Sequence, residues 1–151
     1  MEIYTEIKIK SQAETVWKLL INLNEYSSWN PFLIQANGDV KEGAKINIHA
    51  KPPGLKSMVF TPTIVKAEAN RELRWKGRFI VPGLFDGEHI FIIEELSNKS
   101  VRLIQKEFYS GLLIPLLSRK LGDNTKKGFE LMNQAVKKRA ELQTSSVLDC
   151  K

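Results

Sequence analysis

The chain has 151 residues, of which 42% are hydrophobic and 26% charged, a composition that fits one soluble domain with a single core and excludes a disordered chain. No apolar run approaches the roughly 20 residues needed to span a bilayer, so we expect no membrane insertion and a cytoplasmic location. The formal net charge of +6 would allow a nucleic-acid or anionic-membrane partner.

The distribution of the basic residues argues against such a partner. Much of the excess is spread along one predicted helix between Arg119 and Arg139, and a run of this kind is usually a solvated face. No exposed aromatic residues are interleaved with it to stack on bases. We therefore expect no nucleic-acid partner.

Cysteine and histidine usage gives no sign of a metal or of any other cofactor. The one cysteine, Cys150, is next to last in a polar segment, without a partner for a disulfide or companions for a zinc site. His49 falls on the predicted solvent side of a strand, with no second ligand at metal-binding spacing. No cofactor is therefore predicted.

The N-terminal third predicts a strand followed by two short helices. Residues 3–9 alternate between apolar and polar positions, which is typical of a half-buried strand. Ser11 and Glu14 have the spacing of a capping box and precede apolar residues at helical spacing. A second brief helix is expected to end near Trp29, because Pro31 disfavours helix just before it.

The next segment predicts strands and turns. Residues 33–36 and 44–51 are strand-like, and Pro52-Pro53-Gly54 marks a turn. Residues 57–69 are long for one strand and contain Pro62, which cannot donate to a ladder, so a bulge or an edge position is predicted. Beyond the proline, Ile64 and Val65 compete for the inner face.

Three further strands alternate cleanly, over residues 73–79, 85–94 and 101–109. The alternation places three polar side chains, His89, Gln105 and Glu107, among apolar neighbours on one face. The predicted inner face comprises Leu73, Trp75, Gly77, Phe79, Phe85, Gly87, His89, Phe91, Ile93, Val101, Leu103, Gln105, Glu107 and Tyr109.

A long amphipathic helix is predicted from about residue 115 to 141, since apolar residues recur there at three- and four-residue spacing. At 1.5 Å per residue it would be about 37 Å long, enough to cross a sheet. Gly122 and Gly128 weaken such a helix and indicate close approach, flexibility or space for something else. Residues 142–151 lack periodicity and are expected to be a flexible tail, which leaves residues 1–141 as one domain.

This order of elements resembles the SRPBCC superfamily, also called START-like or birch-pollen-allergen-like, and especially its small bacterial polyketide cyclase/dehydrase-type members. The resemblance rests on Val16-Trp17, Tyr26, Trp29-Asn30-Pro31-Phe32, Leu73-Arg74-Trp75-Lys76-Gly77, Gly83-Leu84-Phe85, Gly87-Glu88-His89, Glu107, Ser110-Gly111-Leu112 and Gly128-Phe129. It implies an α+β helix-grip fold, in which a curved seven-stranded antiparallel sheet surrounds the long C-terminal helix, with two short helices after the first strand. A deep, mostly apolar cavity would lie between sheet and helix.

The first functional hypothesis is non-catalytic binding of an apolar or aromatic small molecule, lipid-like or polyketide-like, in that cavity. Aromatic walls with a few convergent polar groups are typical of small-molecule sites, whereas a fully packed core is the structural alternative. The candidate ligand-binding residues are Trp29, Phe32, Phe60, Trp75, Gly77, Phe79, His89, Phe91, Leu103, Gln105, Glu107, Tyr109, Phe129 and Met132.

The second hypothesis is an enzyme of the cyclase or dehydratase type, in which His89 and Glu107 exchange protons with a carbonyl compound. A plain hydrogen-bonded pair that satisfies two buried polar groups explains the same residues. A third possibility, a protein-binding module like the superfamily's chaperone activators, has only the basic helix face in its support. Ligand identity and oligomeric state stay open.

Overall fold

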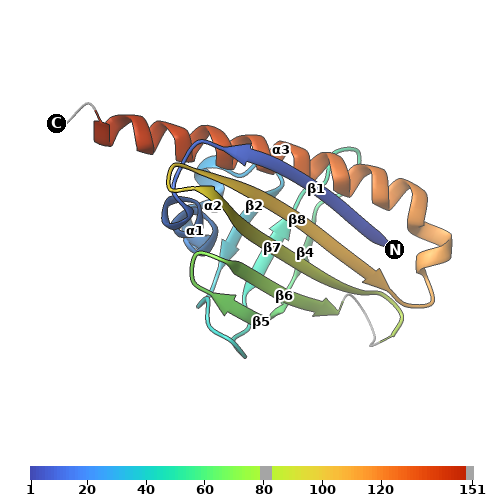
Figure 1. Cartoon of the computed structure of the whole chain (residues 1–151). Coiled ribbons are helices and arrows are strands. Elements are labelled where there is room, and N and C mark those ends of the chain that lie inside the picture. The colour runs from blue at the N-terminus through green and yellow to red at the C-terminus, as the bar shows by residue number, and fades with distance from the viewer. Residues whose placement is uncertain (79–82, 149–151) are drawn as a thin grey trace.

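The computed structural model describes residues 1–78 and 83–148, which form an α+β fold of antiparallel sheets and a long C-terminal helix (Figure 1). The elements in chain order are β1 (Glu2–Ile9), α1 (Ala13–Ile21), the 3-10 turn η1 (Leu23–Glu25), α2 (Tyr26–Trp29), β2 (Leu33–Asn37), β3 (Asn47–Ala50), β4 (Met58–Phe60), β5 (Thr63–Glu68), β6 (Glu72–Arg78), β7 (Asp86–Ser97), β8 (Ser100–Ser110) and α3 (Ile114–Leu148). The two short helices predicted after the first strand are confirmed.

The strands form two sheets, so the prediction of a single seven-stranded sheet is wrong. One sheet has five strands in the order β1-β8-β7-β6-β5, and the other has three in the order β2-β3-β4. The difference arises at Pro62, because residues 57–69 form two strands that belong to different sheets. Backbone hydrogen bonds from Ile64 N to Ala44 O (2.9 Å) and from Ile46 N to Pro62 O (3.0 Å) connect the sheets beside this crossing.

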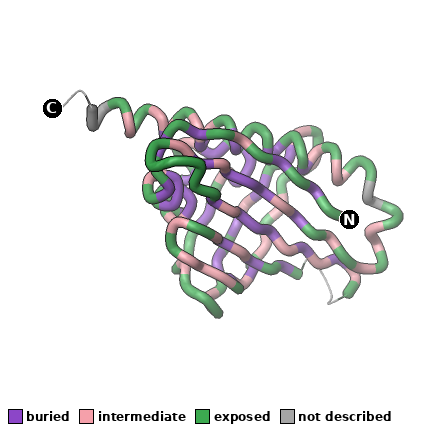
Figure 2. The backbone as a smooth tube through the Cα atoms, in the orientation of Figure 1, coloured by how far each residue is buried: buried purple, intermediate pink, exposed green. Residues whose placement is uncertain are grey.

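The inner face of the five-stranded sheet is the one that alternation predicts. Buried and less buried positions alternate along β6 and, apart from the buried outer-face residues Ile90 and Ile104, along most of β7 and β8 (Figure 2). Ile64 is buried and Val65 is exposed, and the strand register shifts between Ile64 and Lys66. Of the two residues that competed for the inner face, Ile64 is therefore the one that occupies it. The polar residues His89, Gln105 and Glu107 are all buried on this face.

Helix α3 runs along the molecule beside β1 and continues to Leu148 (Figure 1), so the expectation that helical structure ends near residue 141 is wrong. The last turns carry polar residues that hydrogen-bond to the helix and to the start of the chain. Thr144 Oγ1 donates to Ala140 O (2.9 Å) and lies 2.9 Å from Ser11 Oγ. Ser145 Oγ donates to Glu141 O. The last turns lack the apolar spacing from which the helix was predicted, and polar side chains form these hydrogen bonds there instead.

The predicted capping box of Ser11 and Glu14 is wrong, because Ser11 contacts Thr144 instead. Helix α1 begins at Ala13 with Gln12 at its N-cap, and no side chain caps it. Ser11, which was expected to cap the helix, is buried and faces Thr144 instead. The serine therefore joins the first loop to the end of α3.

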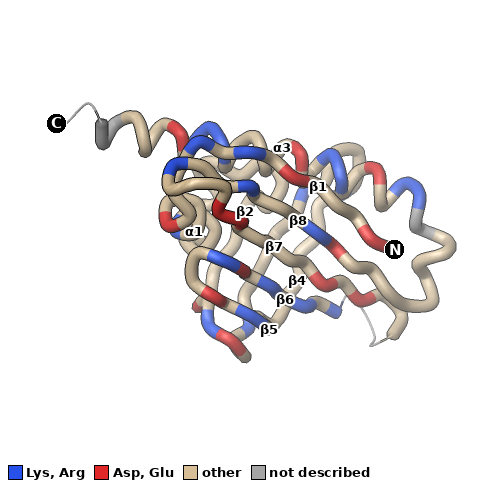
Figure 3. The backbone as a smooth tube through the Cα atoms, in the orientation of Figure 1, with Lys and Arg blue, Asp and Glu red and all other residues tan. Residues whose placement is uncertain are grey.

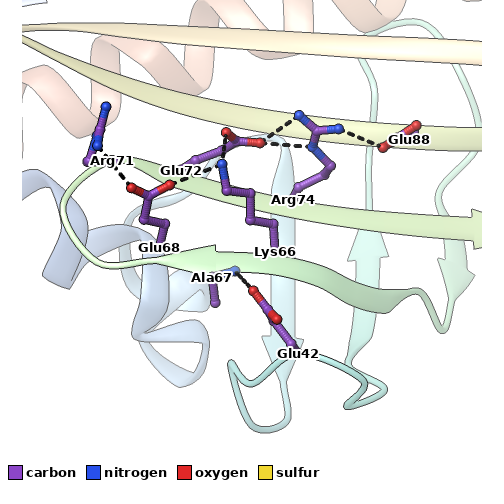
Figure 4. A network of polar contacts seen from close by, with 8 residues as sticks. All are labelled: Glu42, Lys66, Ala67, Glu68, Arg71, Glu72, Arg74 and Glu88. Atoms are coloured by element: carbon purple, nitrogen blue, oxygen red, sulfur yellow. Dashed lines mark hydrogen bonds and ion pairs between the residues drawn. The ribbon is translucent and has the colours of Figure 1, made fainter.

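The outer face of the five-stranded sheet carries a network of ion pairs (Figure 4). Glu72 accepts from Lys66 and Arg74, each at 2.6 Å, and Arg74 also reaches Glu88 at 3.3 Å. Glu68 pairs with Lys66 at 3.0 Å. This charged side faces solvent, so any apolar site of the five-stranded sheet lies on the opposite, inner face.

Candidate ligand-binding site

A cavity lies between the inner face of the five-stranded sheet, the three-stranded sheet and α3. Its volume is about 30 Å³, room for a few water molecules and far less than the roughly 300 Å³ or more of a typical small-molecule site. The lining residues are Phe32, Leu33, Ala50, Pro52, Met58, Phe60, Trp75, Gly77, Gly87, His89, Glu107, Tyr109, Leu121 and Thr125. The walls are therefore mainly apolar, and the polar groups gather on β7, β8 and α3.

His89 and Glu107 form a buried hydrogen-bonded pair in this cavity. They lie directly opposite each other on β7 and β8, with 2.7 Å between Nδ1 and Oε2. Only 4% of His89 and 7% of Glu107 is exposed. When Glu107 is ionised and the imidazole is neutral, Nδ1 carries the proton and Nε2 keeps a lone pair, because a carboxylate oxygen only accepts. Nε2 is buried and has no hydrogen-bond partner among the described residues.

Aromatic rings on three sides fix the orientation of the imidazole. The Trp75 indole stacks on it, with centroids 5.0 Å apart and planes inclined by 16°. Phe91 packs against it at 4.3 Å, and Phe129 of α3 meets it edge-on at 4.8 Å and 85°. The histidine is thus held by packing as well as by Glu107.

Two glycines leave space next to this pair. Gly77 and Gly87 lie opposite each other on β6 and β7, two residues along the strands from Trp75 and His89. Both are buried and line the cavity. Because side chains two apart share a face of the sheet, any larger residue at either position would project into the cavity.

Tyr109 and Thr125 supply hydroxyl groups to the same cavity. The Tyr109 ring stacks on Phe85 with centroids 5.3 Å apart, and its hydroxyl lies 3.5 Å from Thr125 Oγ1. Burial, and secondarily the charge of Glu107, raises the pKa of Tyr109 well above its usual value. The phenol therefore stays protonated and can donate a hydrogen bond.

Gln105 is buried on the inner face but lies outside the cavity lining. Its Nε2 donates to Asn133 Oδ1 at 2.7 Å, and Asn133 Nδ2 donates to Thr5 Oγ1 at 3.1 Å. This chain of side chains joins β8, α3 and β1. Its role is to satisfy buried polar groups between sheet and helix.

The structure divides the predicted site residues into three groups. Those that line the cavity are Phe32, Phe60, Trp75, Gly77, His89, Glu107 and Tyr109. Those that are fully buried behind the lining are Phe91, Leu103, Gln105, Phe129 and Met132. Phe79 lies outside the described residues, and Trp29 is elsewhere.

Trp29 is not part of the lining of this cavity but belongs to a separate surface cleft, so its ligand-binding role stays a prediction. It lines that cleft with residues of α1 and of the C-terminal part of α3, Arg139 among them. The reason lies in the turn after α2, where Asn30 Oδ1 accepts from the backbone N–H groups of Phe32 (3.0 Å) and Leu33 (2.9 Å). The turn directs Phe32 into the cavity, while Trp29 packs edge-on against Tyr26 at 5.1 Å.

The list of candidate ligand-binding residues omits half of the cavity lining, although the sequence had already placed Gly87 and Met58 on the apolar side. The residues not named as candidates are Leu33, Ala50, Pro52, Met58, Gly87, Leu121 and Thr125. Some carried a usable signal: Met58 alternates with Phe60, Gly87 shares a face with His89, and Leu121 and Thr125 are four apart on the helix. Pro52 had none, because a turn does not reveal which way it faces.

Neither a metal centre nor a membrane span is found in the described part of the chain. No group of three or more histidine, cysteine, aspartate or glutamate side chains there could hold a metal ion. Within residues 1–78 and 83–148, no helix combines the length and the apolar character needed to cross a membrane.

The fold has many solved relatives at low sequence identity. The ZhuI aromatase/cyclase from Streptomyces sp. R1128 gives a TM-score of 0.78 at 15% identity and covers 95% of each chain. A START superfamily protein from Mycobacterium smegmatis gives 0.77 at 16% identity, over 94% of this chain and 98% of that one. A protein from Thermus thermophilus gives 0.73 at 16% identity, over 93% and 97%. At these identities the likeness shows the fold alone.

Sequence comparison supplies the family. A search of curated proteins gives no match. The model of the family described as "Polyketide cyclase / dehydrase and lipid transport" matches residues 1–141, which is most of the chain. The protein therefore belongs to the polyketide cyclase/dehydrase and lipid transport family, the SRPBCC-type assignment that its sequence motifs indicate.

Proposed function

We propose that the protein binds an apolar or aromatic small molecule, lipid-like or polyketide-like, in the cavity between the five-stranded sheet and α3. One observation carries this proposal: a buried His89–Glu107 pair, whose His89 Nε2 has no hydrogen-bond partner among the described residues, stands in a mainly apolar cavity. Buried polar groups are normally satisfied. A ligand hydroxyl that donates to Nε2 would complete the pair, and the Tyr109 phenol would donate to a second ligand oxygen.

A ligand larger than water must displace part of the rim, since the cavity volume is only about 30 Å³. Strand β4, which contributes Met58 and Phe60, is the part most easily moved. It has three residues, lies at the edge of the three-stranded sheet and follows a turn-rich segment. Elements with few backbone bonds open at the lowest free energy, so we expect β4 to shift when the cavity fills.

Binding can be tested with 1-naphthol, an aromatic ring with a single hydroxyl donor. Titration followed by tryptophan fluorescence should saturate, because Trp75 lines the cavity. Gly87→Leu should abolish saturation by filling the cavity. His89→Phe should weaken binding about tenfold or more, since a buried hydrogen bond is lost. Trp29→Phe, which alters a tryptophan outside the cavity, is the matched control and should bind normally. Binding unaffected by both cavity variants would contradict the proposal.

Acid–base catalysis of the cyclase or dehydratase type is the second candidate. It is favoured by the geometry of His89, in which one ring nitrogen is oriented by a carboxylate and the other is left with a lone pair. In a dehydration, Nε2 would take a proton from the carbon beside a ketone and a C=C bond would form. The β-hydroxyl would leave as water with the proton that the imidazolium returns.

The two candidates are separated by Glu107→Gln, which keeps the size of the side chain but removes its charge. An aromatic β-hydroxyketone would serve as substrate, with loss of water followed by mass spectrometry. Catalysis predicts that turnover is lost in Glu107→Gln and His89→Ala, while Glu107→Gln still binds 1-naphthol. Turnover that is equal in all three proteins would remove the catalytic candidate and leave the binding proposal standing.

A further inference from the structure

The two most exposed large apolar side chains of the described chain lie together at the start of α3. Leu112 is 83% exposed in the turn after β8, and Leu116 is 82% exposed in the first turn of the helix. A single exposed leucine is ordinary. Two within four residues, beside a third and a fourth apolar residue at half-buried Leu113 and Ile114, form an apolar tip.

Four exposed basic residues follow this tip along α3: Arg119, Lys120, Lys126 and Lys127. Figure 3 shows Lys and Arg positions in this part of the helix. Only one acidic residue, Asp123, lies among them. None of the four forms an ion pair within the described part of the chain, whereas Lys137 further along the helix pairs with Glu141 at 2.7 Å. Their charge is therefore available to a partner.

Leu116 and the four basic residues share one side of the helix. Arg119 and Lys120 follow Leu116 by three and four residues, the spacing that places side chains on one face. We call Leu112, Leu116, Arg119, Lys120, Lys126 and Lys127 the entrance patch. Its apolar and cationic parts are contiguous, unlike the purely solvated face that the basic residues alone suggested.

The entrance patch lies next to the cavity. Leu121 and Thr125, from the same segment of α3, line the cavity, and Leu121 is about 7.5 Å along the helix axis from Leu116 at 1.5 Å per residue. The loop that contains Pro52 packs here too, because a Cβ on Gly54 would lie 3.5 Å from the Asn124 side chain. The patch thus covers the outer side of the segment whose inner side closes the cavity.

We propose that the entrance patch docks on the surface of an anionic phospholipid bilayer. Exposed apolar side chains beside Lys and Arg side chains without ion pairs complement the surface of a membrane, where acyl chains lie under negatively charged headgroups. The leucine side chains would enter the membrane–water interface, and the four Lys and Arg side chains would contact the lipid headgroups. A second copy of this chain fits poorly as the partner. A two-fold contact through this patch would bring its four basic side chains close to the same four side chains of the other copy, and like charges repel. Nucleic acid fits poorly as the partner because leucine side chains cannot stack on nucleobases.

This inference goes beyond the proposed cavity binding, and it concerns a different surface. If both hold, docking would bring the cavity to the place where apolar molecules are dissolved. The docking itself requires no cavity ligand, so the two proposals can be tested apart.

The test is co-sedimentation of the full chain with phosphatidylcholine vesicles, with and without phosphatidylglycerol. We expect binding only to the anionic vesicles, weakening as salt rises. The double variants Leu112→Gln/Leu116→Gln and Arg119→Glu/Lys120→Glu should each lower partitioning about tenfold or more. Leu142→Gln and Lys138→Glu change exposed residues near the other end of α3 and should bind as the original chain does.

Three results would overturn the proposal. The first is no binding to anionic vesicles at low salt, and the second is an equal loss in the control variants. The third is a dimer in sedimentation velocity without vesicles that Leu116→Gln dissociates, because the patch would then be a self-association surface. Circular dichroism checks that each variant is folded. 1-Naphthol binding retained alongside lost vesicle binding would show that docking fails while cavity binding stands.

Discussion

The imidazole of His89 lies nearly parallel to the indole of Trp75, with ring centroids 5.0 Å apart, and the two residues face each other directly across β6 and β7. This stacking aligns the ring so that Nδ1 meets Glu107 on the next strand at 2.7 Å. Three neighbouring strands therefore cooperate to fix one titratable ring. The resulting geometry is the basis of both candidate functions and of the first prediction.

Removal of the Glu107 carboxylate should destabilise the fold, because His89 Nδ1 would lose its partner in a buried site. We expect Glu107→Ala to lower the free energy of unfolding by about 1–3 kcal/mol, measured by urea denaturation. Glu94→Ala removes an exposed carboxylate from the neighbouring strand β7 and should change it by less than about 0.5 kcal/mol. Similar small effects for both would mean that the buried pair contributes little to stability.

The two glycines of α3 should respond to alanine with opposite signs. A Cβ on Gly128 would overlap the ring of Phe32, lying 2.7 Å from its Cε2. A Cβ on Gly122 would have, among the described atoms, only Met1 Sδ nearby, at 3.4 Å. Gly128→Ala should therefore destabilise the protein by about 1–3 kcal/mol through overpacking. Gly122→Ala should stabilise it by up to about 1 kcal/mol through helix propensity.

Thermal denaturation of the two variants measures this contrast directly, and each serves as the control of the other. The prediction fails if both shift the midpoint in the same direction.

The contrast also shows what the sequence could reveal about α3. Both glycines indicate close approach or free space, yet only the fold distinguishes them, because Phe32 comes from a distant turn. Strand alternation was more informative. It placed His89, Gln105 and Glu107 on the buried face, because a period of two fixes the face without any knowledge of the partner strand.

Two features that the sequence could not resolve, the path of the chain at Pro62 and the directions of Trp29 and Phe32, both depend on information that is not local. Pro62 indicated an irregularity, but whether a chain bulges or crosses to another sheet depends on the strands that it meets there. Trp29 and Phe32 are three residues apart in an aromatic-rich turn, and the position of Phe32 depends on the hydrogen bonds accepted by Asn30 and on packing against Phe129 of α3. The ligand-binding roles of the candidate residues stay predictions.

The buried chain of Gln105, Asn133 and Thr5 should depend on its middle member. Asn133→Ala removes the 2.7 Å bond from Gln105 Nε2, which keeps only a 3.4 Å bond to Phe129 O, and it removes the bond that Thr5 Oγ1 accepts. A loss of about 1–3 kcal/mol in unfolding free energy is therefore expected. The triple variant Thr5→Val, Gln105→Leu and Asn133→Leu replaces all three by apolar groups and should lose less than the single variant. Urea denaturation of both proteins would refute this if the triple variant proved the weaker.

The ion pairs of the outer face predict a pH dependence of stability at Glu72. Burial raises the pKa of Glu72, but hydrogen bonds from Lys66 and Arg74 outweigh it and hold the pKa below its usual value. A lowered carboxyl pKa contributes stability above the unfolded value of about 4.3, and that contribution is lost as the pH falls through the folded pKa.

Glu72→Gln should therefore reduce the unfolding free energy at neutral pH, by about 1 kcal/mol for such a partly exposed network, and the difference should vanish in acid. In a Lys66→Met/Arg74→Met background only burial acts on Glu72, so Glu72→Gln should no longer destabilise at neutral pH. Urea denaturation of the four proteins between neutral and acidic pH completes this cycle. A deficit for Glu72→Gln that stays constant across that range would assign the effect to packing rather than to charge.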